Sequence, residues 1–362
     1  MRSIAPRLAF IDALKAIASQ LIVLHHLALY GPMSDVASPL APSLFSWLIQ
    51  NARIAVQVFL VIGGFLAARA LAPSGKLITD KPLALLKKRY FKLLIPYLAA
   101  VLLSVVCAAL ARSLLDDASI PDPPGVWQVL AHVTLTQSLL GFDSLSAGVW
   151  YIAIDFQLFA LLLFTLWLAR VAGRGPAGPR FLGLALVAAL ALGSLFLFNR
   201  DSGWDHWALY FFGAYALGGL SYWLTETRHP AGWLLVMAGV VLVALVIDFR
   251  SRIAVALLVA LVLGIAQLRG FIQCRPRGAV FAALGKISYA VFLVHFPVIL
   301  VINAIVSRFA PANPSANAMG IVFAWAASIA AGAVFYRWVE CRSSYWQGLA
   351  MKPFMWRFRT KP

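Results

Sequence analysis

Long apolar runs separated by short polar or charged stretches recur along the whole chain. A helix needs about 20 predominantly apolar residues to cross a bilayer. The stretch 126–140 is too short and too polar to span, and we expect it to form an interfacial helix. The runs predict ten membrane-spanning helices, at residues 8–30, 45–71, 91–115, 148–171, 180–199, 206–224, 230–247, 252–269, 280–306 and 316–338.

The composition requires lipid as the solvent for much of this apolar surface. Of the 362 residues, 62% are hydrophobic and only 12% are charged, whereas about a quarter of the residues of a soluble domain are charged. A soluble protein of this size could not bury so much apolar surface in one core. We therefore predict an all-α fold, a polytopic transmembrane helix bundle of about ten spans.

Most of the Lys and Arg residues fall on one side of this predicted bundle. The formal net charge is +17, with 30 Lys and Arg against 13 Asp and Glu. With both termini in the cytoplasm, 23 of the 30 lie on the inner side, 6 on the outer side, and Lys15 within the first span. Cytoplasmic loops of membrane proteins carry such an excess. The basic balance is therefore a topology signal, and we expect no nucleic-acid partner.

One membrane domain accounts for nearly the whole chain. We place it at residues 1–345, followed by a short basic cytoplasmic tail at residues 346–362. Polar side chains interrupt the first apolar run too often for a secretory signal, so we expect this run to be retained as a helix. The three cysteines form no even set, and the sequence predicts neither a disulfide framework nor a metal site.

Ionisable residues gather in the first predicted span. Lys15 and His26 are eleven residues apart, close to three helical turns, so they share a face at a Cα separation of about 16 Å. Asp12 and Ser19 lie on the same stripe, while His25 points elsewhere around the helix. Ionisable groups inside a membrane are costly and usually mark function. Alternatively, Lys15 snorkels to the interface and His26 is an interhelical hydrogen-bonding residue.

Three further residues could complete a site with His26. Arg53 stands near the outer end of the second span, Asp155 lies in the fourth, and His295 lies in the ninth. A structural ion pair would also explain Asp155, and polar packing would also explain His295. Glu340, at the end of the last span, is interpreted as a surface partner of Arg337. A histidine, a carboxylate and cations suit general-base chemistry, with an anionic donor held at the basic inner face.

Several stretches form a recognisable pattern when they are taken in order. They are Phe10–His26, Arg53–Leu66, Lys88–Pro96, Trp150–Phe159, Gly285–Pro297 and Tyr336–Glu340. This pattern resembles the acyltransferase-3 family of membrane acyltransferases, which carries an Arg, ten residues and a His in its first helix. Lys15 takes the place of that Arg, and His26 that of the His. Asp155 takes the place of the first Glu in a Glu-Glu-Gln-Phe-Tyr motif.

The resemblance implies an integral membrane enzyme of the O-acetyltransferase type, and we expect no fused esterase-like domain. The donor substrate would be acetyl-CoA or another acyl-CoA on the cytoplasmic side, with no metal. The acceptor would be a hydroxyl of an envelope glycan or a lipid-linked saccharide. The protein would be a multi-pass protein of the bacterial inner membrane, in contact with the lipid bilayer.

Each candidate residue receives a role in this hypothesis. His26 is the general base or a transient acyl carrier, and Asp155 or His295 orients it. Arg53 positions the acceptor or polarises the thioester carbonyl. The phosphates of CoA are held electrostatically by the remaining basic residues, which are Lys15, Lys88, Arg89 and Lys92.

A transporter is the main alternative, with the intramembrane polar residues forming a proton or substrate path. Many transporters contain related halves with broken helices, and the sequence shows no such symmetry. A non-catalytic scaffold would need a partner-binding domain, and none is visible in the sequence. The transferase is therefore the function that the sequence favours.

Overall fold

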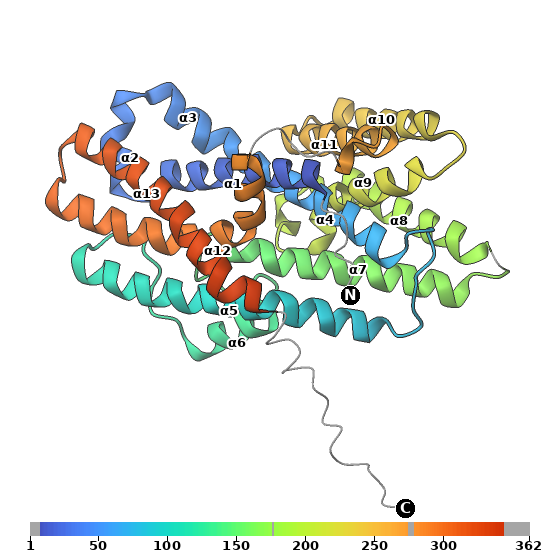
Figure 1. The fold of residues 1–362 in the computed structure, drawn as a ribbon, viewed down its shortest axis with the longest axis horizontal. Helices are drawn as coiled ribbons and strands as arrows, with labels where there is room; N and C mark the ends of the chain where they lie inside the picture. Colours follow the sequence, from blue (N-terminus) through green and yellow to red (C-terminus); the bar gives the residue numbers. More distant parts are fainter. Residues whose placement is uncertain (1–7, 176, 274–278, 344–362) are drawn as a thin grey trace, which may run out of the picture.

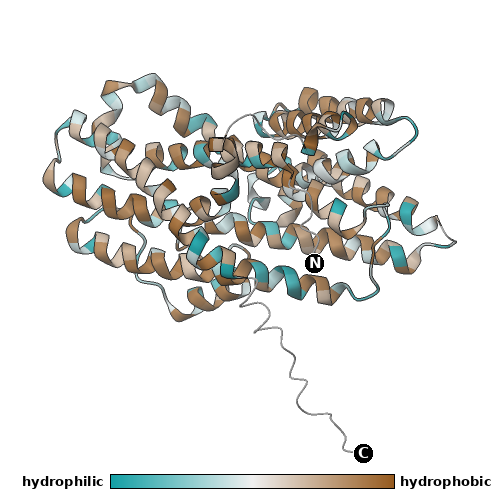
Figure 2. Ribbon diagram, in the orientation of Figure 1, coloured by the Kyte–Doolittle hydropathy of each residue, from teal (hydrophilic) through white to brown (hydrophobic). Residues whose placement is uncertain are grey.

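The computed structural model describes residues 8–175, 177–273 and 279–343. These residues form helices and connecting loops, with no β-strand among them. Most of the long helices lie roughly along one direction and α13 crosses them obliquely (Figure 1), and hydrophobic residues dominate their bodies (Figure 2). The predicted all-α polytopic bundle is confirmed. The predicted tail at 346–362 lies outside the described residues.

Thirteen α-helices and six short helical turns follow one another along the described chain. In the first half these are α1 (Ala9–Leu29), α2 (Pro32–Ala37), η1 (Ser38–Leu40), α3 (Pro42–Asn51), η2 (Ala52–Ile54), α4 (Ala55–Leu71), α5 (Pro82–Leu114), α6 (Val126–Thr134) and α7 (Val149–Ala172). In the second half they are α8 (Gly178–Phe196), η3 (Phe198–Arg200), η4 (Ser202–Trp204), α9 (Ala208–Thr225), α10 (Pro230–Ile247), α11 (Ser251–Leu268), η5 (Phe271–Gln273), α12 (Ala279–Phe309), α13 (Pro314–Phe335) and the π-helical turn η6 (Tyr336–Glu340).

Nine helical segments in the described part of the chain are long and apolar enough to cross a membrane. The predicted span at 206–224 corresponds to a further long helix, α9, in which Tyr, Trp, Ser, Thr and Gly dilute the apolar residues. The surroundings of α9 explain this composition, because it packs against α4, α7, α8, α10 and α11. Neighbouring helices rather than lipid bury most of its side chains, so α9 needs no continuous apolar surface.

The backbones of α4 and α9 touch at two glycines. A Cβ atom on Gly64 would lie 1.8 Å from the carbonyl oxygen of Tyr215, and one on Gly218 would lie 1.9 Å from that of Val61. Any side chain at either position would therefore force the two helices apart. Small residues allow this kind of close approach between membrane helices.

Two of the predicted spans differ from the helices observed. The span predicted at 91–115 begins earlier, at Pro82, so Lys87, Lys88 and Arg89 lie on the first turns of α5. Proline is well suited to the first turn of a helix, where its missing N–H would have no partner. The span predicted at 45–71 is divided by the short turn η2, which carries Arg53.

A short helix occupies the stretch predicted to be interfacial. It is α6, and its Val126 and Trp127 side chains are about three-quarters exposed, at 74% and 73%. Exposed apolar side chains on a short helix suit a position at a membrane surface. The interfacial location itself stays a prediction.

Candidate active site

Two histidines that are far apart in the sequence meet inside the bundle. Helices α1 and α12 pack along each other, and a Cβ on Gly285 would lie only 2.2 Å from the carbonyl oxygen of Asp12. This close packing brings Nδ1 of His26 to 2.7 Å from Nε2 of His295. The two rings stack at an interplanar angle of 9°, and the residues are 6% and 0% exposed. The structure thus unites two of the predicted site residues in a buried pair.

The hydrogen bonds of His295 determine which nitrogen of His26 is free. Nδ1 of His295 lies 2.7 Å from the carbonyl oxygen of Phe292, and only a protonated nitrogen donates to a carbonyl. A neutral His295 therefore accepts at Nε2, and His26 donates its Nδ1 proton there. This tautomer is assigned from the hydrogen-bond pattern. It leaves Nε2 of His26 with the lone pair that a general base needs.

His26 lines a cavity of about 770 Å³. Its walls include His25, Tyr30, Arg53 and Trp150, together with residues from the connection between α5 and α7. This volume falls within the range of small-molecule sites. The cavity lies at the end of the bundle that the charge pattern predicts to be outer. A substrate that enters from this end would therefore reach His26.

Arg53 belongs to this end of α1 and is separate from the other predicted donor-binding residues. The η2 turn holds it exposed on the cavity wall, and its charge acts on His25, His26 and Tyr30. Its role beside the acceptor or the thioester stays a prediction.

The Lys15 end of α1 carries a second group of charged residues. Lys15 is half-buried and lies within electrostatic range of Asp12, Arg89, Lys92 and Glu340. Three of the predicted donor-binding residues, Lys15, Arg89 and Lys92, are thus neighbours. The fourth, Lys88, is exposed on α5 and acts on Lys92.

The interpretation of Glu340 as a surface partner of Arg337 is wrong. The charges that act on Glu340 are those of Lys92 and Lys15, and Arg337 is exposed. The reason is local, because the chain passes through the π-helical turn η6, which packs against α5 and α12. The wider turn carries Glu340 towards α5.

Asp155 is the ion-pair partner of Arg89, and it forms no hydrogen bond with His26 in the described part of the chain. The carboxylate, 5% exposed, forms an ion pair with the Arg89 guanidinium. It also lies against Gly63, where a Cβ would be 3.3 Å from Oδ1 of Asp155. Of the two residues predicted to orient His26, the structure places only His295 in hydrogen-bond contact with it. A buried guanidinium paired in this way is also less available to CoA phosphates than Lys88 or Lys92.

Several buried polar atoms near this ion pair have no hydrogen-bond partner in the described part of the chain. They are Nε of Arg89 and the hydroxyl oxygens of Tyr215 and Tyr289. Tyr289 precedes His295 by six residues on α12, about 9 Å along the helix axis towards the Lys15 end. Buried polar groups are normally paired, so these atoms mark a place between the two ends of α1 where a polar ligand could bind.

The sequence interpretation missed three residues of the outer end. His25 was expected to point elsewhere, yet it lines the same cavity as His26, with Nδ1 2.9 Å from the carbonyl oxygen of Leu48. Arg250 and Arg252 line an adjoining cavity. Because only six Lys and Arg residues fall on the predicted outer side, the departure of these two from the positive-inside bias was a signal that could have found them.

The fold and the site together define a class of protein. It is a multi-pass membrane protein with a buried histidine pair at the wall of a cavity. A family model described as an acyltransferase domain matches residues 8–337. The chain therefore belongs to the acyltransferase-3 family, and it is a membrane acyltransferase.

A search of curated proteins found one more distant similarity. The chain is 26% identical over 121 residues to the Regulator of hypoxia-inducible factor 1 of Caenorhabditis elegans, a match that covers 32% of this chain and 23% of that protein. The similarity therefore extends over less than a quarter of the relative's length. No solved structure matches the chain.

Proposed function

We propose that this enzyme moves an acetyl or related acyl group from cytoplasmic acyl-CoA to a hydroxyl of an envelope glycan or a lipid-linked saccharide. Its location would be the bacterial inner membrane. The observation that carries the proposal is the His26–His295 pair, which leaves Nε2 of His26 unprotonated at the edge of a cavity. Family membership supplies the general class of reaction.

The histidine pair acts on the acceptor hydroxyl. Nε2 of His26 takes the hydroxyl proton while the hydroxyl oxygen attacks the carbonyl carbon of the thioester. A C–O bond forms, the C–S bond breaks, and the thiolate of CoA leaves and recovers the proton from His26 as a thiol. His295 holds the ring of His26 in the required tautomer and shares the positive charge that develops on it. Arg53 stands at the same cavity and can polarise the thioester carbonyl.

A transient acyl carrier uses the same nitrogen. Nε2 of His26 then attacks the thioester first, and the C–S bond breaks with departure of the CoA thiolate. In a second step the oxygen of the acceptor hydroxyl attacks the acyl carbon, the C–N bond to His26 breaks, and the hydroxyl proton passes to the thiolate. Both mechanisms require a free Nε2 and the His295 contact. They differ in whether labelled acyl groups stay on the protein when the acceptor is withheld.

The donor would bind at the opposite end of α1. Lys88 and Lys92 are exposed there beside Lys15, and their ammonium groups suit the phosphates of CoA. The pantetheine arm would then extend along α1 towards His26. The unpartnered hydroxyl groups of Tyr215 and Tyr289 would then hydrogen-bond to its amide groups.

The test is acyl transfer in membranes that contain the full chain. Membranes are incubated with acetyl-CoA labelled in the acetyl group, and label in the glycan fraction is counted. We expect His26→Ala to lower transfer by about a thousandfold, since general-base catalysis typically contributes 10²–10⁴. His229→Ala is the matched control, because His229 is exposed in the connection between α9 and α10.

Two results would contradict the proposal. Full transfer by His26→Ala at normal protein levels would remove the histidine from the chemistry. Label that crosses the membrane without becoming attached to a glycan would indicate a transporter instead.

A further inference from the structure

A cavity of about 640 Å³ adjoins the His26 cavity at the same end of the bundle. The two share wall residues, among them His25, Arg53, Trp150 and Phe211. Three arginines line it, Arg53, Arg250 and Arg252, and no Asp or Glu is among its described lining residues. A concave site with three cations and no carboxylate in its wall is suited to an anion.

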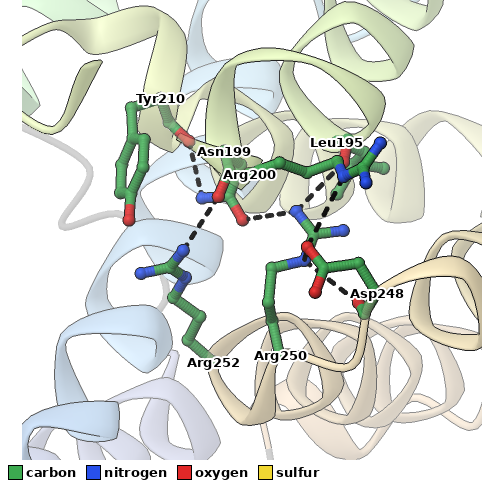
Figure 3. A network of polar contacts seen from close by, with 7 residues as sticks. All are labelled: Leu195, Asn199, Arg200, Tyr210, Asp248, Arg250 and Arg252. Atoms are coloured by element: carbon green, nitrogen blue, oxygen red, sulfur yellow. Dashed lines mark hydrogen bonds and ion pairs between the residues drawn. The ribbon is translucent and has the colours of Figure 1, made fainter. Parts of the chain in front are cut away.

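Arg250 links two helices in the wall of this cavity. Its Nη1 donates to the carbonyl oxygen of Leu195 at 3.0 Å and to Oδ1 of Asn199 at 2.8 Å, which joins the start of α11 to the end of α8 (Figure 3). The residue is only 8% exposed, and its Nη2 is buried without a hydrogen-bond partner in the described structure. Arg250 therefore combines a structural role with an unused donor.

Arg252 and Arg53 leave more of their hydrogen-bonding capacity available. Arg252 donates from Nη2 to the carbonyl oxygen of Asn199 at 2.8 Å, and its guanidinium lies 4.8 Å from the ring centre of Tyr210 (Figure 3). Neither Arg252 nor Arg53 forms an ion pair with a carboxylate of the described residues. Since α11 packs against η2, the two arginines approach the cavity from neighbouring elements.

Three arginines and one aspartate form a polar network beside the cavity, namely Arg200, Arg250, Arg252 and Asp248. Asp248 serves two arginines, with Oδ2 3.4 Å from Nε of Arg250 and 3.5 Å from Nε of Arg200 (Figure 3). Burial lowers the pKa of Arg250 from its ordinary value; Asp248 opposes this effect, and Arg252 and Arg200 add to it. An additional anion in the cavity would therefore be favourable.

The concentration of arginines around this cavity is unusual for the predicted outer side of the membrane. Of the six Lys and Arg residues on the predicted outer side, four belong to this network or line its cavity, namely Arg53, Arg200, Arg250 and Arg252. The positive-inside bias gives no reason for cations on the outer side. A ligand that requires them does.

Aromatic side chains form another part of the wall. Trp150, Tyr210, Phe211 and Phe249 line the cavity. Trp150 and Tyr210, whose rings are apolar on their faces and carry a polar group at one end, suit a ligand with both apolar and polar surfaces, such as a sugar ring. Cations and aromatic rings together therefore point to an acidic saccharide.

We propose that this cavity binds the anionic group, a phosphate or a carboxylate, of an acidic saccharide acceptor, with Arg53 and Arg252 as its ligands. The bound saccharide extends into the adjoining cavity and presents a hydroxyl to His26. This inference rests on the proposed function and narrows it, because the acceptor becomes an acidic sugar.

The test measures binding without acyl-CoA, so that it does not depend on catalysis. The full chain, purified in detergent, is unfolded thermally in the presence of glucuronate, glucose 1-phosphate or neutral glucose. A ligand that binds the folded state raises the unfolding temperature in a saturable manner. We expect both acidic sugars to do so and glucose to have no effect. The two acidic probes distinguish a carboxylate site from a phosphate site.

Matched variants locate the effect. Arg252→Gln should raise the apparent Kd for the acidic sugar by about tenfold, in the range expected for the loss of one charge-assisted contact. Arg252→Lys should retain part of the affinity, which controls for folding. Arg308→Gln removes an exposed arginine from the end of α12 and should bind as the original protein does. His26→Ala should also bind normally, which separates this inference from the proposed chemistry.

Several outcomes would overturn the inference. These are equal stabilisation by glucose, unchanged binding by Arg252→Gln, or displacement of the acidic sugar by CoA, which would make the cavity a donor site. In lipid nanodiscs, displacement of glucuronate by phosphatidylglycerol would instead identify a lipid headgroup site.

Discussion

The two ends of α1 differ in how positive charge is balanced. Near Lys15 the cations have carboxylate neighbours, since Arg89 is paired with Asp155 and Lys15 lies within range of Asp12 and Glu340. Near His26, the adjoining cavity has arginines in its wall and no carboxylate among its described lining residues.

This difference separates two uses of charge. A buried cation with its own carboxylate is already satisfied, and it fixes how the helices pack. A cation that lines a cavity without such a partner can still form an ion pair with an anionic ligand. Charge near Lys15 therefore stabilises the packing of the helices, whereas Arg53 and Arg252 near His26 are available to a ligand such as the proposed acceptor.

Breaking the ion pair at the inner end should have the largest effect. Arg89→Gln leaves the buried carboxylate of Asp155 without its partner, and we expect the free energy of unfolding to fall by about 3–5 kcal/mol. The double variant Arg89→Gln with Asp155→Asn should recover most of this loss, since no uncompensated charge remains. Unfolding followed in detergent would measure both. Equal losses in the single and double variants would show that the pair is not the cause.

Removal of His295 should affect the rate more than binding. Without the contact to its Nε2, the ring of His26 loses its fixed tautomer, and we expect His295→Ala to lower kcat about a hundredfold with little change in the KM for acyl-CoA. Steady-state kinetics with purified protein would separate the two constants. An unchanged kcat would show that the contact between the rings is structural.

Loss of one exposed cation at the inner end should give a smaller change. Lys92→Gln removes a charge near Lys15 and should raise the KM for acyl-CoA by about threefold to tenfold, with kcat retained. Its binding of glucuronate should be normal, which is the opposite of the result expected for Arg252→Gln. Lys76→Gln, in the exposed connection before α5, is the control. A weaker affinity for glucuronate in Lys92→Gln would contradict the separation of the two ends.

The smallest expected effect is a loss of stability at low pH caused by protonation of His132 in α6. His132 accepts a hydrogen bond from the N–H of Leu145 and is within 2.8 Å of the carbonyl oxygen of Gln128, which requires the neutral ring. Burial lowers the pKa of His132 below its ordinary value of 6.5, partly opposed by the bond to Gln128. The neutral His132 contributes fully to the free energy of unfolding above pH 6.5. This contribution declines at lower pH, because the ring takes up a proton more readily in the unfolded state than in the folded state.

Unfolding temperatures measured between pH 7.5 and pH 5 would show this decline, and His132→Gln should reduce it. An identical pH profile in the two proteins would mean that another group is responsible. Because His132 ties α6 to the connection that follows it, the decline should be accompanied by faster proteolysis of residues 135–148.

The sequence predicts most of the fold because a membrane span requires only a continuous run of apolar residues, which is a local property of the chain. A run of apolar residues identifies a span whatever its neighbours are, and the helices follow the predicted runs closely. The exceptions depend on surroundings: α5 begins at Pro82 and so includes basic residues that the apolar run leaves out, and the break at η2 interrupts a run that remains apolar on both sides.

The site is less accessible to such reasoning because its contacts join distant parts of the chain. The spacing of Lys15 and His26 is a property of one helix and could be predicted. The choice between His295 and Asp155 as the partner of His26 could not, because it depends on how α1, α5, α7 and α12 pack. Arg250 and Arg252 were visible in the sequence only as charges on an unfavoured side.

The contact between α4 and α9 has a mechanical consequence. Two helices in backbone contact at Gly64 and Gly218 can neither slide nor rotate without steric overlap, so they move as one rigid body. Their ends present Arg53, just before α4, and Phe211, within α9, to both cavities. That wall keeps its shape when empty, and a preorganised surface loses little entropy on binding. Under the proposed function, selection of the acceptor therefore depends on how well it fits this fixed surface.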